Sequence, residues 1–351
     1  MKLKFSDFEV IPIIDTVRQL EMTDEEYFSP KYGKYVSNSR LNLINPKRGG
    51  SPESYIENAH TSTNSLNIGS AVHEILLQPE SFNLAPKMGK PSAKLGEVID
   101  QIYNNRQKGM SIYDSIIAAS QKVGYFVNTI DKKIPMIIEK GLQYYVNLST
   151  PRTKYANKEE IILNDKDYDT VTGCLESCYE NHQIMDYLHP KDTWGDDIQS
   201  RCEDALFIDF LVTYKDKQCS RIKFKLKIDN WTIDFENKKI TLNDLKTSSK
   251  NLDYFMNREF GSFTHYNYYR QLYVYSAILW YYCQKKYGVS KEAGWSIDCN
   301  ILAVQTTDDF KSRRFNISRD WLKMGKIEFE MLMKRVAALD IFDTETQIDF
   351  I

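Results

Sequence analysis

Apolar and polar residues alternate from residue 225 to residue 247, which is the period-2 pattern of β-strands. Residues 236–239 read as a turn, so the stretch predicts a β-hairpin. The first strand would place Ile228 on one face and Asp229 on the other. The returning strand, 240–246, ends in the letters D-L-K. Such a hairpin can bring Asp229 beside this D-L-K end.

The rest of the chain predicts further strands and helices of an α/β (α+β) protein with an antiparallel-rich sheet. Strand patterns cover residues 159–163, 199–201, 205–212, 221–229, 231–235, 240–246, 296–305 and 312–317. Helical patterns cover residues 38–44, 53–59, 68–78, 98–107, 112–123, 134–148, 167–180, 183–188, 264–285 and 321–339. Residues 1–36 are polar and contain tyrosines, so we expect an N-terminal arm there. The helical block at about 84–150 reads as a lid or a DNA-contacting subdomain.

Composition limits the classes of partner. The chain has 351 residues, of which 42% are hydrophobic, enough for a full core. Its formal charge of -2 means that nucleic acid would have to meet a local basic patch. Among several basic clusters, Lys311–Arg314 lies near a predicted strand edge and is the first candidate for phosphate contact.

Cysteine spacing and hydropathy argue against several other classes. The six cysteines are scattered without a C-x-x-C pair, so they do not supply a zinc or iron–sulfur site. We interpret them as reduced thiols of a cytoplasmic protein. The N-terminus lacks the apolar core of a signal peptide, and no apolar run is long enough to span a bilayer. No membrane partner is therefore expected.

Polar residues with metal chemistry follow the hairpin. Asp244 and Lys246 are two apart, so they share one face of a strand, and Asp229 comes close to them. Two carboxylates and an amine at the end of a sheet suit a hard divalent cation. Upstream, His73 projects from a predicted helix whose sequence is G-x-x-x-H-E, and Gln271 lies in the later Q-x-x-x-Y helix. Each motif alone is common, since a D-x-K tripeptide is usually a solvated strand end.

Taken in order, these motifs make the chain resemble the PD-(D/E)XK nuclease superfamily, and more closely its RecE-type, exonuclease VIII-like branch of phage recombination exonucleases. The similarity rests on S-N-S-R-L, I-G-S-A-V-H-E-I-L-L-Q-P-E-S-F, K-L-K-I-D, D-L-K-T-S and Y-Y-R-Q-L-Y-V-Y. It spans roughly Ser37 to Leu339. The chain departs from the family pattern at three points. It has Asp244 in place of Glu, Lys227 where many members have Arg, and Leu226 where RecB-like relatives have Gly.

The resemblance implies a fold and a site. The fold would be a restriction-endonuclease-like core with a central mixed sheet flanked by helices, in a nuclease domain over residues 37–340. The helical insertion at about 84–150 would interrupt this domain, and residues 341–351 would form a tail. The implied ligands of Mg²⁺ or Mn²⁺ are His73, Asp229, Asp244 and the carbonyl of Leu245. The implied catalytic residues are Asp229, Asp244, Lys246, Gln271 and Tyr275.

Within that set the roles differ. Lys246 would orient or help deprotonate the attacking water, while Gln271 and Tyr275 would position the DNA backbone or the lysine. Glu74, the last residue of the G-x-x-x-H-E motif, is a candidate partner of a metal ligand or else a solvent-facing helix acid, and Glu203, before a predicted strand, is a further candidate outer acid.

The implied activity is a metal-dependent exonuclease that acts on ends of linear double-stranded DNA, 5′ to 3′, and leaves single strands for recombination. The family also implies a ring-shaped homo-oligomer and a single-strand annealing protein as partner. Two alternatives stay open. The first is an endonuclease, nickase or end-trimming nuclease on the same core. The second is a catalytically inactive, nuclease-derived DNA-binding module.

Overall fold

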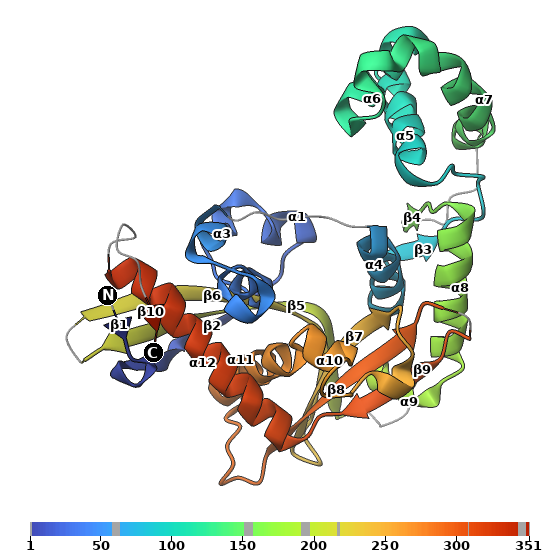
Figure 1. Ribbon diagram of the computed structural model, residues 1–351. Coiled ribbons are helices and arrows are strands. Elements are labelled where there is room, and N and C mark those ends of the chain that lie inside the picture. The colour runs from blue at the N-terminus through green and yellow to red at the C-terminus, as the bar shows by residue number, and fades with distance from the viewer. Residues whose placement is uncertain are drawn as a thin grey trace. The chain divides into compact units, whose positions relative to one another are not determined.

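A mixed six-stranded sheet forms the framework of one of the two units of the computed structural model (Figure 1). The strand order is β2-β5-β6-β7-β8-β9. Only β7 and β8 pair in parallel, and the other neighbours are antiparallel. The predicted fold class, a mixed central sheet flanked by helices, is confirmed. The strands are β2 (Phe8–Leu20), β5 (Ile198–Tyr214), β6 (Gln218–Asp234), β7 (Lys239–Ser248), β8 (Ser296–Gln305) and β9 (Ser312–Asn316).

The chain divides into two units, and the structure describes most of each. The described residues are 2–57, 64–150, 157–190, 197–215, 218–307, 309–342 and 349–350. The sheet unit comprises residues 1–61, 178–305 and 311–351, and the helical unit comprises residues 62–177 and 306–310. The helical unit is therefore longer at both ends than the predicted insertion. Residues 343–348 and 351 of the predicted tail lie outside the described residues.

One face of the sheet carries the main core of the sheet unit. Phe224, Leu226 and Ile228 of β6 are at most 1% exposed, as their alternation predicts. Phe224 packs edge-on against Phe329, with ring centroids 5.7 Å apart. Each such burial contributes about 1.5–3 kcal/mol. The helices that cover this face are α11 (Tyr268–Tyr287) and α12 (Arg319–Ile341).

The opposite face is covered by the N-terminal segment, which differs from the predicted arm. Residues 8–20 form the edge strand β2, paired antiparallel with β5. After it, α1 (Asp24–Tyr27) and η2 (Pro30–Tyr32) place two tyrosines on Phe207, which is fully buried. The strand contains Pro12, which an edge strand tolerates because its outer N–H groups need no partner. Apolar and polar residues do not alternate regularly along β2, so the period-2 pattern did not predict this strand.

A buried polar network joins the N-terminal helices to the main core. The guanidinium of Arg270 is fully buried and lies 3.3 Å from the Glu328 carboxylate. It also donates hydrogen bonds to Asn38 and Asn42, while Asn45 donates to Glu328 at 2.8 Å. The remaining short elements of the sheet unit are α2 (Asn38–Leu41), η3 (Asn42–Ile44), η4 (Pro46–Arg48), α3 (Pro52–Glu57), α9 (His182–Leu188), η7 (Leu252–Tyr254) and α10 (Ser262–His265), with β1 (Lys2–Leu3) paired to β10 (Asp349–Phe350).

The predicted long aromatic helix is broken into α10 and α11. Asn267, between the two, has a φ of +57°, in the left-handed region. Asparagine visits this region more readily than most residues. The break changes the chain direction immediately before Tyr268, so Tyr268 begins the second helix instead of lying inside one.

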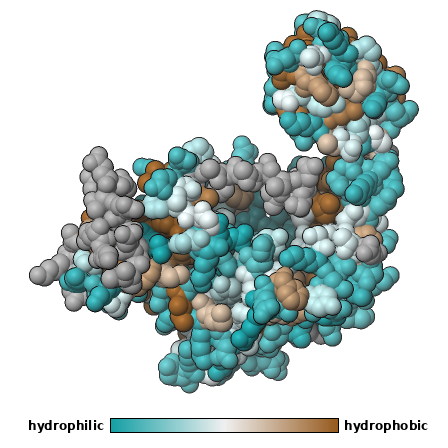
Figure 2. Space-filling model, viewed as in Figure 1, coloured by the Kyte–Doolittle hydropathy of each residue, from teal (hydrophilic) through white to brown (hydrophobic). Residues whose placement is uncertain are grey.

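The helical unit has a core of its own. Val98, Ile99, Ile116 and Ile137 are buried together there with Tyr144. Figure 2 shows hydrophobic residues among hydrophilic ones on the surface of the α5–α7 part. The elements are α4 (Asn64–Leu77), β3 (Phe82–Leu84), α5 (Ala93–Gln107), α6 (Ile112–Val123), η5 (Val127–Thr129), α7 (Ile130–Ser149), β4 (Glu159–Ile161) and most of α8 (Asp165–Tyr179). Among all described residues, no helix has both the length and the apolar character needed to cross a bilayer.

Candidate metal centre

The candidate site begins where strands β6 and β7 separate. The recorded pairing between them starts at Asp234 opposite Lys239 and ends at Asn230 opposite Asn243. Immediately beyond that last pair, Oδ2 of Asp229 accepts a hydrogen bond from the backbone N–H of Leu245 at 2.7 Å. The carboxylate thus satisfies a backbone donor at the point where the ladder ends. This bond fixes Asp229 beside the D-L-K end, as the hairpin predicted.

Lys246 lies between the two aspartates. Its Nζ is 2.8 Å from Oδ2 of Asp244 and 3.8 Å from Oδ2 of Asp229. Burial alone would lower the pKa of Lys246, but the two carboxylates outweigh it and leave that pKa raised. The ammonium is therefore protonated at neutral pH. The same Nζ donates to the Leu245 carbonyl at 3.2 Å.

Asp244 is buried and held from the helix that follows. Its side chain is 1% exposed, and its Oδ1 accepts a hydrogen bond from Nε2 of Gln271 at 2.7 Å. Burial raises the pKa of Asp244 to about 7; Asp229 adds to this rise and Lys246 opposes it. Tyr275, one turn after Gln271, is partly buried, and desolvation raises its pKa well above the usual value. The hydrogen bond shows that Gln271 contacts the carboxylate of Asp244 directly, which the Q-x-x-x-Y motif did not specify.

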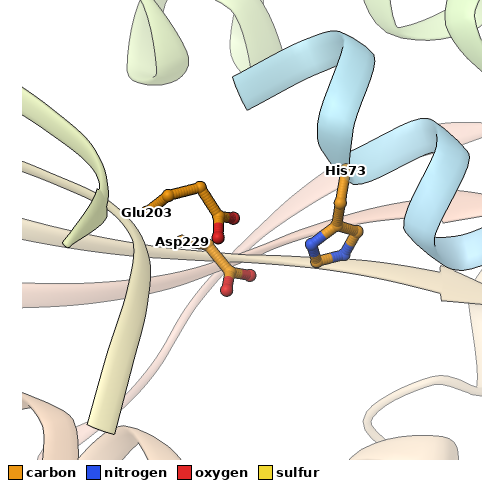
Figure 3. A group of neighbouring side chains, drawn as sticks. All are labelled: His73, Glu203 and Asp229. Carbon is orange, nitrogen blue, oxygen red and sulfur yellow. The ribbon is translucent and has the colours of Figure 1, made fainter. Parts of the chain in front are cut away.

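Glu203 is the acid that the motif set did not include. It lies on β5 with a φ of +53°, a left-handed conformation that is uncommon for glutamate. A carboxylate oxygen of Glu203 comes within 4.8 Å of one of Asp229. Figure 3 shows the two carboxylates from neighbouring strands, and it also labels His73 on α4, which belongs to the helical unit. Strained backbone of this kind often marks a functional site.

A lysine from the same sheet holds Glu203. Nζ of Lys227 forms ion pairs with both Glu203 and Asp24 of α1. Burial raises the pKa of Glu203 to about 7; Asp229 reinforces the rise, and Lys227 only partly opposes it. No sequence motif could have found the partnership with Asp24, because the two residues are 203 positions apart.

An asparagine ladder fixes the register of the strands that carry the acids. Asn243 donates to Asn230 at 2.8 Å, and Asn300 of β8 donates to Asn243 at 3.0 Å. Arg314 of β9 donates to Asn300 at 3.1 Å, and its guanidinium lies over the Tyr187 ring at 4.3 Å. Arg314, which belongs to the predicted phosphate-contact cluster, therefore contacts Asn300 and Tyr187 within the sheet unit. Its hydrogen bond satisfies the buried amide of Asn300.

Of the remaining predicted residues, two belong to the helical unit and one lies on strand β7. His73 and Glu74 are on α4 of the helical unit, and Leu245 is on β7 between the two members of the D-x-K pair. The residues gathered within the sheet unit are Glu203, Asp229, Asp244, Leu245, Lys246, Gln271 and Tyr275.

The donors present fit a hard divalent cation. Glu203, Asp229 and Asp244 offer carboxylate oxygens, which Mg²⁺ and Mn²⁺ prefer. Two of these groups have a pKa raised to about 7, because each carboxylate is buried near another one. A bound cation would offset that repulsion and favour both ionised forms. Lys246 and Lys227 already offset part of it.

Comparison with known proteins identifies no family. No protein-family model matches the chain, and no curated protein matches it significantly. Among solved structures, the chain is similar to a protein from Eubacterium rectale described as a "putative exonuclease", at 14% sequence identity and a TM-score of 0.46. The match covers 93% of this chain and 89% of that chain. This similarity is too distant to assign an activity.

Proposed function

We propose that the protein is a divalent-metal-dependent nuclease that hydrolyses phosphodiester bonds of linear double-stranded DNA from its ends. The observation that carries the proposal is the placement of Lys246 between Asp229 and Asp244, with Glu203 beside Asp229. Phosphodiester hydrolysis needs a nucleophile formed near neutral pH and stabilisation of added negative charge. An acid cluster with a protonated lysine at its centre suits both needs when a cation is bound.

In the proposed site, Asp229, Asp244 and Glu203 would hold Mg²⁺ or Mn²⁺ with the Leu245 carbonyl, and the resemblance to RecE-type exonucleases implies His73 as a further ligand. Such an ion, when bound, lowers the pKa of a water molecule and neutralises phosphoryl oxygens. Imidazole favours a site that accepts Mn²⁺ as well as Mg²⁺.

Lys246 has a charge-stabilising role in this proposal. In the metal-free protein the two aspartates raise its pKa, so the ammonium is a hydrogen-bond donor beside both carboxylates. It orients the attacking water and offsets charge that builds on the phosphoryl oxygens. Gln271 fixes the orientation of Asp244 through its hydrogen bond to Oδ1. Tyr275 supports Gln271 from the next turn of α11.

The finer features follow the resemblance to RecE-type exonucleases. We propose 5′-to-3′ polarity, single-stranded products that serve recombination, a homo-oligomer, and a single-strand annealing protein as partner. An endonuclease, a nickase or an end-trimming nuclease would use the same acids. These readings differ in whether the enzyme needs a DNA end.

The test compares linear and covalently closed duplex DNA, each incubated with Mg²⁺, Mn²⁺ or EDTA. Linear substrates carry a label at the 5′ or the 3′ end, so that the first labelled product reports polarity. The site variant is Asp244→Asn. The matched control is Asp298→Asn, which changes an acid of the same sheet that is 44% exposed and paired with Lys239.

We expect metal-dependent digestion of linear DNA by the wild type and by Asp298→Asn. Closed circles should stay intact, and Asp244→Asn should be inactive while remaining folded. Cleavage in EDTA, or wild-type rates for Asp244→Asn, would overturn the proposed site. Cleavage of closed circles would replace the exonuclease by an endonuclease on the same acids.

A further inference from the structure

Four aromatic rings of the sheet unit are stacked in a row, with an exposed ring at one end and a buried ring within it. The ring centroids of Tyr266 and Tyr268 lie 5.6 Å apart at an interplanar angle of 30°. Tyr268 stacks on Phe255 at 6.1 Å and 21°, and Phe255 stacks on Phe315 at 5.0 Å and 17°. We call these four residues the ring stack.

The ring stack contains one buried ring, and the exposed ring at its end also contacts the imidazole of His265, with ring centroids 4.7 Å apart. Phe255 is 1% exposed, whereas Tyr266 is 44% exposed. Tyr266 stacks on the partly buried Tyr268, which stacks on the buried Phe255, so the exposed ring is already ordered and a further flat group can bind it at a small entropic cost. Nucleotide bases are such groups, and every base has a π face that can stack on tyrosine.

The ring stack passes beside the candidate metal centre. Nζ of Lys246 lies 5.4 Å from the ring centroid of Tyr268, the second ring of the row. At the outer end, the guanidinium of Arg48 lies 5.7 Å from the ring centroid of Tyr266. Nη1 of Arg48 also donates to the backbone carbonyl of His265 at 2.7 Å. A cation therefore stands next to the exposed ring, where the phosphate of a stacked nucleotide would be attracted.

We propose that Tyr266 is a stacking platform for an unpaired DNA base near the scissile phosphate, with Arg48 facing the backbone of the same strand. This subsite rests on the proposed nuclease function and adds a contact for single-stranded DNA. It accepts any base, because stacking reads no base edge. Tyr254 offers a contrast, since it is 58% exposed but lies tilted by 52° against Phe260, outside the ring stack.

Binding is measured in EDTA, so that no strand is cut. The probes are duplexes with a short 5′ or 3′ overhang, labelled with fluorescein at the far end and followed by fluorescence anisotropy. Each overhang nucleotide is replaced in turn by an abasic residue. The proteins are the wild type, Tyr266→Ala, Tyr266→Phe and, as the control for loss of an exposed ring, Tyr254→Ala. Cleavage of the same duplexes with Mg²⁺ is recorded in parallel.

For the wild type, we expect one abasic position to weaken binding by about fivefold or more. Tyr266→Ala should weaken binding of the intact probe by a similar factor and show no further loss with that abasic probe. Tyr266→Phe and Tyr254→Ala should retain the wild-type dependence on the base. An equal abasic effect in Tyr266→Ala, or none in the wild type, would overturn the subsite. If the wild type cuts DNA in that case, the proposed function survives, whereas a wild type that neither binds nor cuts refutes both.

Discussion

Replacing Glu203 by Gln should stabilise the metal-free protein, and more so at high pH. The side chain of Glu203 is 17% exposed, and its pKa is raised to about 7 by burial and by Asp229, from an ordinary value of 4.5. An unfolded chain ionises this group above pH 4.5, whereas the folded protein keeps the proton up to about pH 7. The folded state therefore binds more protons in this window, and stability falls as the pH rises through it.

The magnitude follows from the shift. A rise of 2.5 units, from 4.5 to 7, corresponds to about 3 kcal/mol against the ionised form above pH 7. Integrated from pH 6 to pH 8, the loss is about 1 kcal/mol. Glutamine has nearly the same shape as glutamate but carries no charge. The Glu203→Gln variant should therefore not lose this stability between pH 6 and pH 8. Lys227 keeps its other partner, Asp24, in the variant.

The assay is urea unfolding in EDTA at pH 6 and pH 8, followed by tryptophan fluorescence. All five tryptophans lie outside residues 62–177 and 306–310, so the signal reports the sheet unit. We expect the stability advantage of Glu203→Gln to grow by about 1 kcal/mol between the two pH values. Glu9→Gln, at an exposed position of β2, is the control and should follow the wild type. An advantage that is the same at both pH values would refute the electrostatic reasoning.

Three further outcomes are expected. Lys246→Met should lower the initial rate of cleavage by about 100-fold or more, because it removes a charged donor from the developing negative charge; a rate within tenfold of wild type would exclude that role. Arg270→Leu should cost about 3–5 kcal/mol in urea unfolding, since it leaves the carboxylate of Glu328 buried without its cation. Gly325→Ala should lower the free energy of unfolding by about 1–3 kcal/mol, because the new Cβ would lie 2.3 Å from the backbone oxygen of Tyr269. An unchanged melting temperature for Gly325→Ala would show that the contact between α11 and α12 relaxes freely.

A break in the alternation of apolar and polar residues was interpreted as the end of a strand, but the strand continues through it. Periodicity predicted two separate strands, 221–229 and 231–235, where the structure has the single continuous strand β6. The buried apolar positions of β6 change from even numbers, ending at Ile228, to odd numbers, beginning at Trp231. Asp229 lies at this change of phase, across from the left-handed Glu203. A break in alternation thus marked the acids and was not the end of a strand.

Local spacing determined what could be predicted from the sequence alone. A two-residue step fixes a strand face, so the D-x-K pair and its hairpin partner Asp229 follow from the sequence, as does the helix that carries Gln271. The tertiary structure decided which distant residues meet them. It brought Glu203 beside Asp229, tied Lys227 to Asp24 of α1, and turned Gln271 toward Asp244.

The reason is that these contacts depend on strand order and on a change of backbone phase. Strand order and the change of phase leave no periodic pattern of apolar residues in the sequence. The apolar residues of the edge strand β2 do not alternate regularly either. Side chains that alternate along one strand reveal its two faces, but only the assembled sheet determines which neighbour lies across from each of them.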